Sequence, residues 1–303
     1  MRILTGFAAA TLLLAGHVTA WGRLGHETVA LLSQQYLLPE TTRTLQTLLS
    51  TTSPTFLGDI ALWADEFRRE PEGAFSTGLH FVNGRDGPPP ESCELDYPGD
   101  CPPEGCIVGA IANYTQRMMR RDLDAVERAR AVKFVVHFLG DIAQPLHTEA
   151  YGAGGNNITI TFNGYATNLH AAWDTSIPHT LLSLPSNATI TSTHSLTLAN
   201  HLAPLLTVGQ YKPTIKRWLR HHTKHAIRTT RGMEKAAAAW AQDGNWEVCA
   251  GVITVHPERL QGRELGGGEY EREARRVVER GLVKGAVRLA GWLNLVVVGR
   301  TGF

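Results

Sequence analysis

Five histidines occupy apolar or glycine-bounded settings in which a solvated imidazole is not the obvious explanation. They are His26 (RLGHE), His80 (GLHFVN), His137 (FVVHFLGD), His147 (AQPLHTE) and His170 (NLHAAWD). His137 and His170 are each followed four residues later by an aspartate, Asp141 and Asp174. Four residues make about one helical turn, so each pair would lie on one face of a helix. Imidazoles and carboxylates gathered in this way could hold a metal ion.

A surface ion pair is the simplest alternative for one such pair, and it would contribute only about 0.2–0.5 kcal/mol. The surroundings of Asp141 do not suit that alternative, because the residues from Phe134 to Ile142 are mostly apolar. Asp65, in IALWADEF, has a similar setting. A buried carboxylate costs several kcal/mol unless it is paired or coordinated. Pro145 ends or kinks the helix, so His147 can approach from a new direction.

Buried histidines and aspartates together suit zinc, which takes imidazole nitrogen and carboxylate oxygen in tetrahedral sites. Iron and manganese use similar ligands, so the residue types alone leave the metal open. A metalloprotease with a His-Glu-x-x-His motif is excluded, because the nearest match, HETVA at residues 26–30, lacks the second histidine.

The elements that would position these residues are mostly helices. Helical spacing of apolar residues recurs near 24–38, 56–69, 106–120, 124–144, 195–208, 213–228 and 269–295. One segment, NNITITFNGYATNLH, alternates β-branched and polar residues around Asn163-Gly164, which predicts a β-hairpin. The glycines at 266–268 and the Pro/Gly-rich loop at 84–106 look like surface connections. We therefore expect one mainly α-helical domain with a small β-hairpin.

Residues 1–20 are predicted to be a signal peptide that is removed. Arg2 provides a positive start, FAAATLLLAG an apolar centre, and Val18-Thr19-Ala20 a cleavage pattern before Trp21. The mature chain would be balanced in charge, since 29 basic residues less Arg2 leave 28 against 28 acidic ones. This balance argues against a broad basic surface for a polyanion. No later apolar run reaches membrane-spanning length, so we expect a secreted protein without a membrane anchor.

Export also makes the cysteines and the glycosylation sequons interpretable. The four cysteines are Cys93, Cys101, Cys106 and Cys249. An even number in an oxidising compartment favours two disulfides, and zinc binding by these thiols is disfavoured because the sequence has no Cys-x-x-Cys pair. The sequons lie at Asn113, Asn157 and Asn187. They predict N-glycosylation.

The segment KRWLRHHTKHAIR, residues 216–228, carries five lysines and arginines that could follow a phosphate backbone. A solvated amphipathic helix explains the same pattern and is the interpretation we favour. His221, His222 and His225 are then expected on its exposed face and not at the metal.

The motifs together resemble those of the zinc-dependent S1/P1 nuclease family, which is related in fold to bacterial phospholipase C. The matching pieces are WGRLGH, WADEFR, LHF, VVHFLGDIAQPLH, GGNNITITFNGYATNLHAAWD and the four-cysteine pattern. They cover nearly the whole mature chain in the family's order. The resemblance implies a mainly α, single-domain phospholipase C/P1 nuclease-like fold, with the catalytic domain over residues 21–303.

The resemblance also implies three zinc ions in one cleft. The first would be held by Asp65, His80, His137 and Asp141. The second would be held by His147, His170 and Asp174. The third would take His26, the other oxygen of Asp141, and the α-amine and carbonyl of Trp21. Cleavage before Trp21 would then create a metal ligand, because a peptide nitrogen is a poor donor and a free amine can bind.

Further residues are assigned to the reaction and the substrate by the resemblance. Arg68 matches the family's catalytic arginine and lies close in sequence to Asp65, which is both catalytic and metal-binding. Without the resemblance, Arg68 would be interpreted as a surface ion-pair partner of Glu70 or Glu72. Phe81 would stack on a base; on its own it would be read as a core residue. Asn83 stands where the family carries a base-binding aspartate, which leaves the base preference open, since an amide both donates and accepts.

Two last features follow from the resemblance. Tyr165, on the hairpin, matches the aromatic residue of a remote nucleotide site in some family members. The implied disulfides are Cys93 with Cys249 and Cys101 with Cys106.

The function implied is hydrolysis of single-stranded RNA and DNA to 5′-phosphorylated products, with 3′-nucleotidase activity. We expect a monomer that acts on single-stranded nucleic acid or nucleotides. One alternative is a phosphatidylcholine-type phospholipase C, disfavoured because the last zinc ligand of the bacterial lipases is a glutamate and the hairpin and cysteine frame are nuclease features. The other is a secreted, non-catalytic zinc-binding protein, disfavoured because no ligand position is missing.

Overall fold

The computed structural model describes residues 21–303, so the predicted signal peptide lies outside the described residues. The α-helices are α1 (Arg23–Gln34), α2 (Pro39–Leu48), α3 (Phe56–Ile60), α4 (Trp63–Phe67), α5 (Ile107–Met119), α6 (Ala125–Asp141), α7 (Leu169–Ala171), α8 (Ile177–Thr180), α9 (Ser192–Thr207), α10 (Ile215–Trp218), α11 (Thr230–Glu247) and α12 (Glu269–Val298). The strands are β1 (Thr159–Phe162) and β2 (Tyr165–Asn168). The fold is therefore mainly α, as the sequence predicts.

Shorter helical turns connect these helices and carry several of the candidate ligands. They are η1 (Ala74–His80), η2 (Pro145–Thr148), η3 (Ala172–Ser176), η4 (Lys212–Thr214), η5 (Ala226–Arg228), η6 (Val248–Val252) and η7 (Pro257–Arg259). Two of them, η3 and η6, are π-helical and the rest are 3-10 turns.

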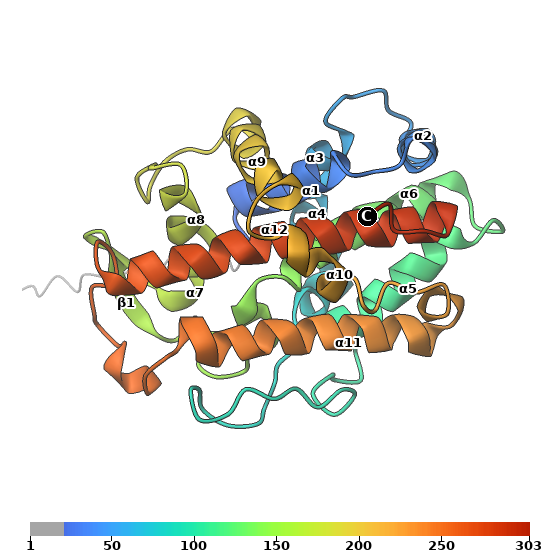
Figure 1. The fold of residues 1–303 in the computed structure, drawn as a ribbon. Coiled ribbons are helices and arrows are strands. Elements are labelled where there is room, and N and C mark those ends of the chain that lie inside the picture. Colours follow the sequence, from blue (N-terminus) through green and yellow to red (C-terminus); the bar gives the residue numbers. More distant parts are fainter. Residues whose placement is uncertain (1–20) are drawn as a thin grey trace, which may run out of the picture.

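The longest helix, α12, packs on α1, α6 and α8, and it runs across the molecule beside α11 (Figure 1). It is long and apolar enough to cross a membrane by length and composition, but 83% of its apolar window is buried inside the protein. Burial of this kind is what a core helix of a globular protein shows, and it accounts for the apolar composition.

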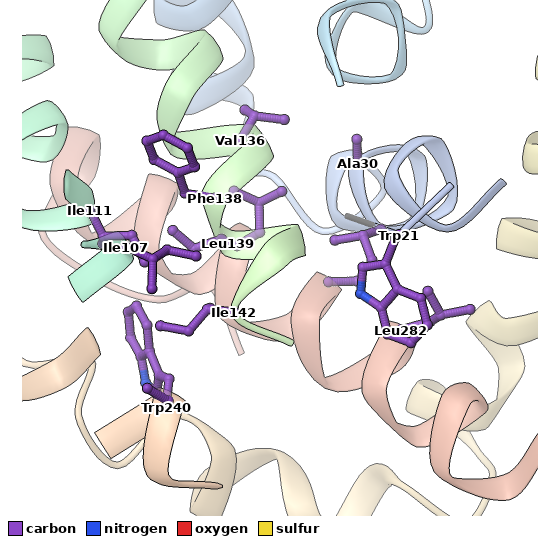
Figure 2. Packing of buried hydrophobic residues seen from close by; sticks show 14 of the residues in the cluster. Trp21, Ala30, Ile107, Ile111, Val136, Phe138, Leu139, Ile142, Trp240 and Leu282 are labelled. Atoms are coloured by element: carbon purple, nitrogen blue, oxygen red, sulfur yellow. The ribbon is translucent and has the colours of Figure 1, made fainter. Parts of the chain in front are cut away.

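The first described residue is part of the core. Trp21 is completely buried, and Figure 2 shows its indole ring next to Leu282 of α12. Two glycines make room for the ring: a Cβ at Gly25 would lie 2.7 Å from the Cβ of Trp21, and one at Gly281 would lie 3.4 Å from Cζ2. The start of α1 is therefore anchored by Trp21, two residues before the helix begins.

Helix α6 supplies the centre of the candidate site. Asp124 caps it by accepting a hydrogen bond from the Glu127 amide, which satisfies one of the free N–H groups of the first turn. The helix ends at Asp141, three residues before the expected end, and the chain turns into η2 at Pro145. Proline has no amide hydrogen and disfavours helix at the residue before it, so the break is local chemistry.

The predicted hairpin is present as the antiparallel pair β1 and β2, with Phe162 opposite Tyr165. Asn163 and Gly164 form its two-residue turn, both with positive φ, 51° and 80°. This backbone is typical of a type I′ turn, which asparagine followed by glycine favours.

Several helix predictions need correction. The segment 213–228 is not one amphipathic helix but two short 3-10 turns and the four-residue α10. His222, expected on an exposed face, is buried, with its ring packed against Trp240 and Trp292. The expected helix at 56–69 is interrupted between α3 and α4. Helices α2 and α11 were not predicted.

The two disulfides join Cys93 to Cys249 and Cys101 to Cys106, the pairing that the resemblance implies. The first fastens the loop before α5 to the turn after α11. The sequon asparagines, Asn113, Asn157 and Asn187, are all exposed, as glycan attachment requires.

Candidate metal centre

Asp141, at the end of α6, lies at the centre of the cluster and has no exposed side-chain surface. Its Oδ2 atom lies 2.9 Å from Nδ1 of His80 and 3.3 Å from Nε2 of His137. Its Oδ1 atom lies 3.2 Å from Nε2 of His26, which α1 supplies. The two oxygens of one carboxylate thus face histidines on two different sides.

Asp65, from α4, approaches the same histidines. Its Oδ1 atom lies 3.7 Å from Nε2 of His137 and 3.8 Å from Nδ1 of His80. Arg68, one turn further along, lies 2.9 Å from the same oxygen through Nη2, so it pairs with Asp65. The arginine is thereby held at the edge of the cluster.

A second group forms where η2, α7 and η3 meet. Nε2 of His170 lies 3.1 Å from Oδ2 of Asp174, and the rings of His147 and His170 are stacked with centroids 5.2 Å apart. Asp174 lies in a π-helical turn, a distortion that is frequent at functional sites.

Hydrogen bonds to backbone carbonyls orient three of the rings. Nδ1 of His137 donates to the Ala61 carbonyl at 2.7 Å. Nδ1 of His147 donates to the His80 carbonyl at 2.9 Å, and Nδ1 of His170 donates to the Gly154 carbonyl at 2.6 Å. A ring that donates from Nδ1 has its lone pair on Nε2 when it is neutral. This arrangement presents Nε2 as a metal ligand.

Burial and the neighbouring charges act on the pKa values of these rings in opposite directions. Burial lowers the pKa of His80 to about 4, against the effect of Asp141. Burial lowers the pKa of His26 and of His147 as well, which favours their neutral forms. At His137 burial also acts to lower the pKa, but Asp141 and Asp65 outweigh it and raise the pKa to about 9. The paired carboxylates therefore favour a positive charge at this point.

The ligand atoms fall into three compact groups, in each of which all atoms lie within 4.8 Å of one another. The groups are His26, Asp65 and His137; His80, His137 and Asp141; and His147, His170 and Asp174. Nε2 of His147 is buried and has no hydrogen-bond partner among the described residues, which is costly for a polar atom. Neutral imidazoles with such lone pairs, set beside buried carboxylates, fit a divalent cation such as zinc.

Trp21 is brought to the same region by the residue that follows it. The amide of Gly22 donates to the carbonyl of Asp174 at 2.8 Å, and a Cβ at Gly22 would lie 2.9 Å from Oγ1 of Thr175. His26 follows one turn later on α1. The start of the described chain is thus tied to the group of His147, His170 and Asp174.

A pocket of about 480 Å³, a size typical of small-ligand sites, opens beside the group that contains His80 and the group that contains His147 and His170. Arg68, Phe81 and Asn83 line it together with His80, His147 and His170. Tyr165 does not line this pocket and lies on the hairpin with 47% of its surface exposed.

Two residues that structure this region were not predicted from the sequence. Gln144 is buried and donates from Nε2 to Oδ1 of Asp174 at 2.7 Å. Glu149 lines the pocket, and burial raises the pKa of its carboxyl to about 7. Gln144 lies between the helix end and Pro145, and this position is a sequence signal that could have predicted its role. Glu149 has no such signal, because its sequence context, LHTEAY, does not predict burial.

Comparison with known proteins gives consistent matches. A family model described as S1/P1 Nuclease matches residues 21–298. Nuclease PA3 from Penicillium sp is 39% identical over 278 residues, 90% of this chain and 97% of the relative, and Nuclease P1 from Penicillium citrinum has the same identity and coverage. Nuclease S1 from Aspergillus oryzae is 36% identical over 305 residues, 98% of each chain. The matched range includes every residue of the candidate metal centre.

Proposed function

Because the chain belongs to the S1/P1 nuclease family, we propose that it is a secreted, zinc-dependent hydrolase that cleaves phosphodiester bonds in single-stranded RNA and DNA. The products would carry 5′-phosphates, and nucleotides with a 3′-phosphate would be hydrolysed as well. The observation that carries this proposal is the convergence of buried imidazole nitrogens and carboxylates beside the pocket.

We propose that these ligands hold three zinc ions, in the sets that the family resemblance implies. Asp65, His80, His137 and Asp141 would hold one ion. His147, His170 and Asp174 would hold the second. His26, the other oxygen of Asp141 and the amine and carbonyl of Trp21 would hold the third. Zinc bound there supplies Lewis-acid chemistry and concentrated positive charge for a phosphate.

Arg68 is proposed to bind a non-bridging phosphate oxygen. Its contact with Asp65 fixes the guanidinium at the edge of the pocket, where it also forms part of the lining. A guanidinium held in this position stabilises charge that develops on phosphorus-bound oxygens without having to reorient.

The preference for single strands would come from Phe81. It lines the pocket directly after His80, and an aromatic ring there can stack only on a base that has no partner strand. Asn83 lines the same pocket and would contact the edge of that base through an amide.

The test is a comparison of substrates on one purified sample. The protein is incubated with poly(A), with duplex DNA and with phosphatidylcholine liposomes, and its zinc content is measured. We expect cleavage of poly(A) to 5′-phosphorylated products and about three zinc ions per chain. Release of phosphocholine would identify a phospholipase C. If a zinc-replete sample cleaves neither poly(A) nor phosphatidylcholine, the protein is a non-catalytic binding protein. A zinc content of about one ion per chain would contradict the three-ion assignment.

A further inference from the structure

A second pocket, of about 350 Å³, lies between the segment that follows α10 and the first turns of α11. Its basic lining residues are Arg220, His221, His225, Arg231 and Lys235. None of the described residues that line it is acidic. A hollow with this lining attracts anions, because converging positive charges and low-dielectric walls concentrate the potential inside it.

The start of α11 forms one wall of this pocket. Thr229 caps the helix by accepting a hydrogen bond from the Gly232 amide at 3.0 Å. A Cβ at Gly232 would lie 2.4 Å from the carbonyl oxygen of Ala226, so the absence of a side chain lets the helix pack directly against the preceding turn. Glycine at this position therefore maintains the shape of the hollow.

The charges on this wall are placed against ordinary helix preferences. Arg231 and Lys235 are four residues apart on one face of α11, where like charges repel by a few tenths of a kcal/mol. Arg231 also lies in the first turn, at the positive end of the helix dipole, and that turn contains no acidic residue. Both side chains are exposed. A bound anion would relieve the repulsion and complement the helix end.

The opposite wall adds to the positive charge. Arg220 donates from Nε to Nε2 of His221 at 2.8 Å, so the imidazole accepts at that nitrogen. The carboxylate that acts electrostatically on His221 is Asp243, which is already bonded to Lys284 and Arg288. The positive charges of Arg220, Arg231 and Lys235 are therefore not neutralised by a carboxylate among the residues that line the pocket.

Helix α11 connects this pocket to the metal centre. At its far end Asn245 donates to the carbonyl of Thr148 at 2.9 Å, next to His147. The 14 residues from Arg231 to Asn245 correspond to about 21 Å along the helix axis. A stacked strand rises about 3.4 Å per nucleotide along its axis, so roughly six nucleotides would span this distance. A dinucleotide bound at the metal centre would not reach.

We propose that this basic pocket binds a phosphate of the polynucleotide backbone and holds long strands while a distant bond occupies the metal centre. The inference rests on the proposed nuclease function and deepens it, because it identifies long polyanionic strands as the preferred substrate. Inorganic phosphate shares the same chemistry and is distinguished from the strand in the test.

The test uses the double variant Arg231→Gln/Lys235→Gln with a 20-nucleotide single-stranded DNA and with a dinucleotide. We expect KM for the 20-mer to rise about three- to tenfold, with kcat unchanged, because two surface charge contacts are lost. The slope of log(1/KM) against log salt concentration should fall by about 0.7, the value for one phosphate of a single strand. Dinucleotide kinetics should not change.

Two controls separate charge at the pocket from charge in general. Arg43→Gln/Arg259→Gln removes the same charge from exposed side chains on α2 and η7 and should leave KM for the 20-mer unchanged. Arg231→Lys/Lys235→Arg keeps the charge and should retain the wild-type KM. Equal melting temperatures would show that all variants are folded.

The outcomes are distinct. An unchanged KM for the 20-mer in the pocket variant, with normal dinucleotide cleavage, would overturn the strand site and leave the nuclease function intact. Calorimetric titration with inorganic phosphate provides the other comparison. If the pocket variant loses phosphate binding but keeps its KM for the 20-mer, the site takes free phosphate and the strand proposal is wrong. Failure of the wild type to cleave either substrate would instead contradict the proposed function.

Discussion

Gln144 orients a candidate ligand from behind the pocket. Its Nε2 donates to Oδ1 of Asp174, while its own Oε1 accepts from the Leu146 amide at 2.6 Å. The side chain is thus fixed through both polar atoms of its amide, and the oxygen of Asp174 that faces His170 is left for a metal ion. Partners of this kind set the orientation of metal ligands and are part of a metal site.

Removal of this support should weaken metal binding without removing a ligand. We predict that Gln144→Ala lowers zinc affinity about 10- to 100-fold, the usual effect of losing a group that orients a ligand. Zinc retention against a competing chelator measures this. The control is Gln35→Ala, because Gln35 makes its hydrogen bond with Asn200 on the surface. Equal zinc retention in both variants would contradict the assigned role.

The amine of Trp21 can be tested separately from its indole ring. A protein that keeps one extra residue before Trp21 retains the ring but converts the amine to a peptide nitrogen. We predict the loss of about one zinc per chain and a fall in activity of at least about 100-fold. Metal analysis together with poly(A) cleavage measures both. Undiminished cleavage by the extended protein would rule out the amine as a ligand.

The predictability of the site differs from residue to residue. His137 and Asp141 could be recognised because a titratable pair stands out in an apolar helix, and Asp65 for the same reason. Glu149 could not, since its burial comes from the pocket wall and from Asn245, far along the chain. The sequence thus indicates groups that contradict their local surroundings and does not indicate groups that only the tertiary fold buries.

At the scale of the elements, α11 and α12 are joined by a partly buried ion cluster. Asp243 of α11 accepts from Lys284 at 2.8 Å and from Arg288 at 2.7 Å, and both cations are almost fully buried. Glu247, one turn later, pairs with Arg280. The cluster sets the relative position of the two long helices that flank the metal centre.

Breaking this cluster should be costly. We predict that Asp243→Asn destabilises the protein by about 3 kcal/mol, because it leaves two buried cations without their main partner. The expected fall in melting temperature is roughly 6–10 °C. The matched control is Asp122→Asn, whose pair with Arg120 is largely exposed and should not affect stability measurably. A similar melting temperature in both variants would show that the cluster does not hold the helices together.

The elements themselves could be predicted only where the local signal agrees with the fold. The Asn163-Gly164 hairpin was found because its turn residues suit the backbone they adopt. Helix α11 was missed because the side it buries consists largely of alanine and glycine, which give a weak apolar period. The segment 213–228 was misassigned because Trp218 and His222 are buried by packing on other elements, which no helical period records.

For the whole molecule, His222 makes stability depend on pH. Its ring lies against Trp240 and Trp292, and Nε2 donates to the carbonyl of Arg288 at 2.9 Å. Burial lowers the pKa of this histidine from 6.5 to about 3. Between these values the unfolded chain binds a proton that the folded protein does not, so stability falls as pH falls from 6.5 towards 3.

We predict that His222→Gln flattens this dependence. The free energy of unfolding is measured by urea titration from pH 7 to pH 4 in the presence of zinc. As pH falls, the free energy of unfolding of the wild type should fall more steeply than that of the variant. The difference in slope should be at most the value that the binding of one proton produces. The proposed metal ligands titrate equally in both proteins and cancel in the difference. Parallel curves would show that the ring is protonated in the folded state.

The burial of Trp21 has a consequence for the lifetime of the protein. After cleavage before this residue, an aminopeptidase would have to extract a fully buried indole and break the hydrogen bond from Gly22 to Asp174 before it could hold the chain end. Stepwise trimming from that end should therefore be slow as long as the fold is intact. An active centre that depends on its first residue would be protected from exopeptidases by the same packing that assembles it.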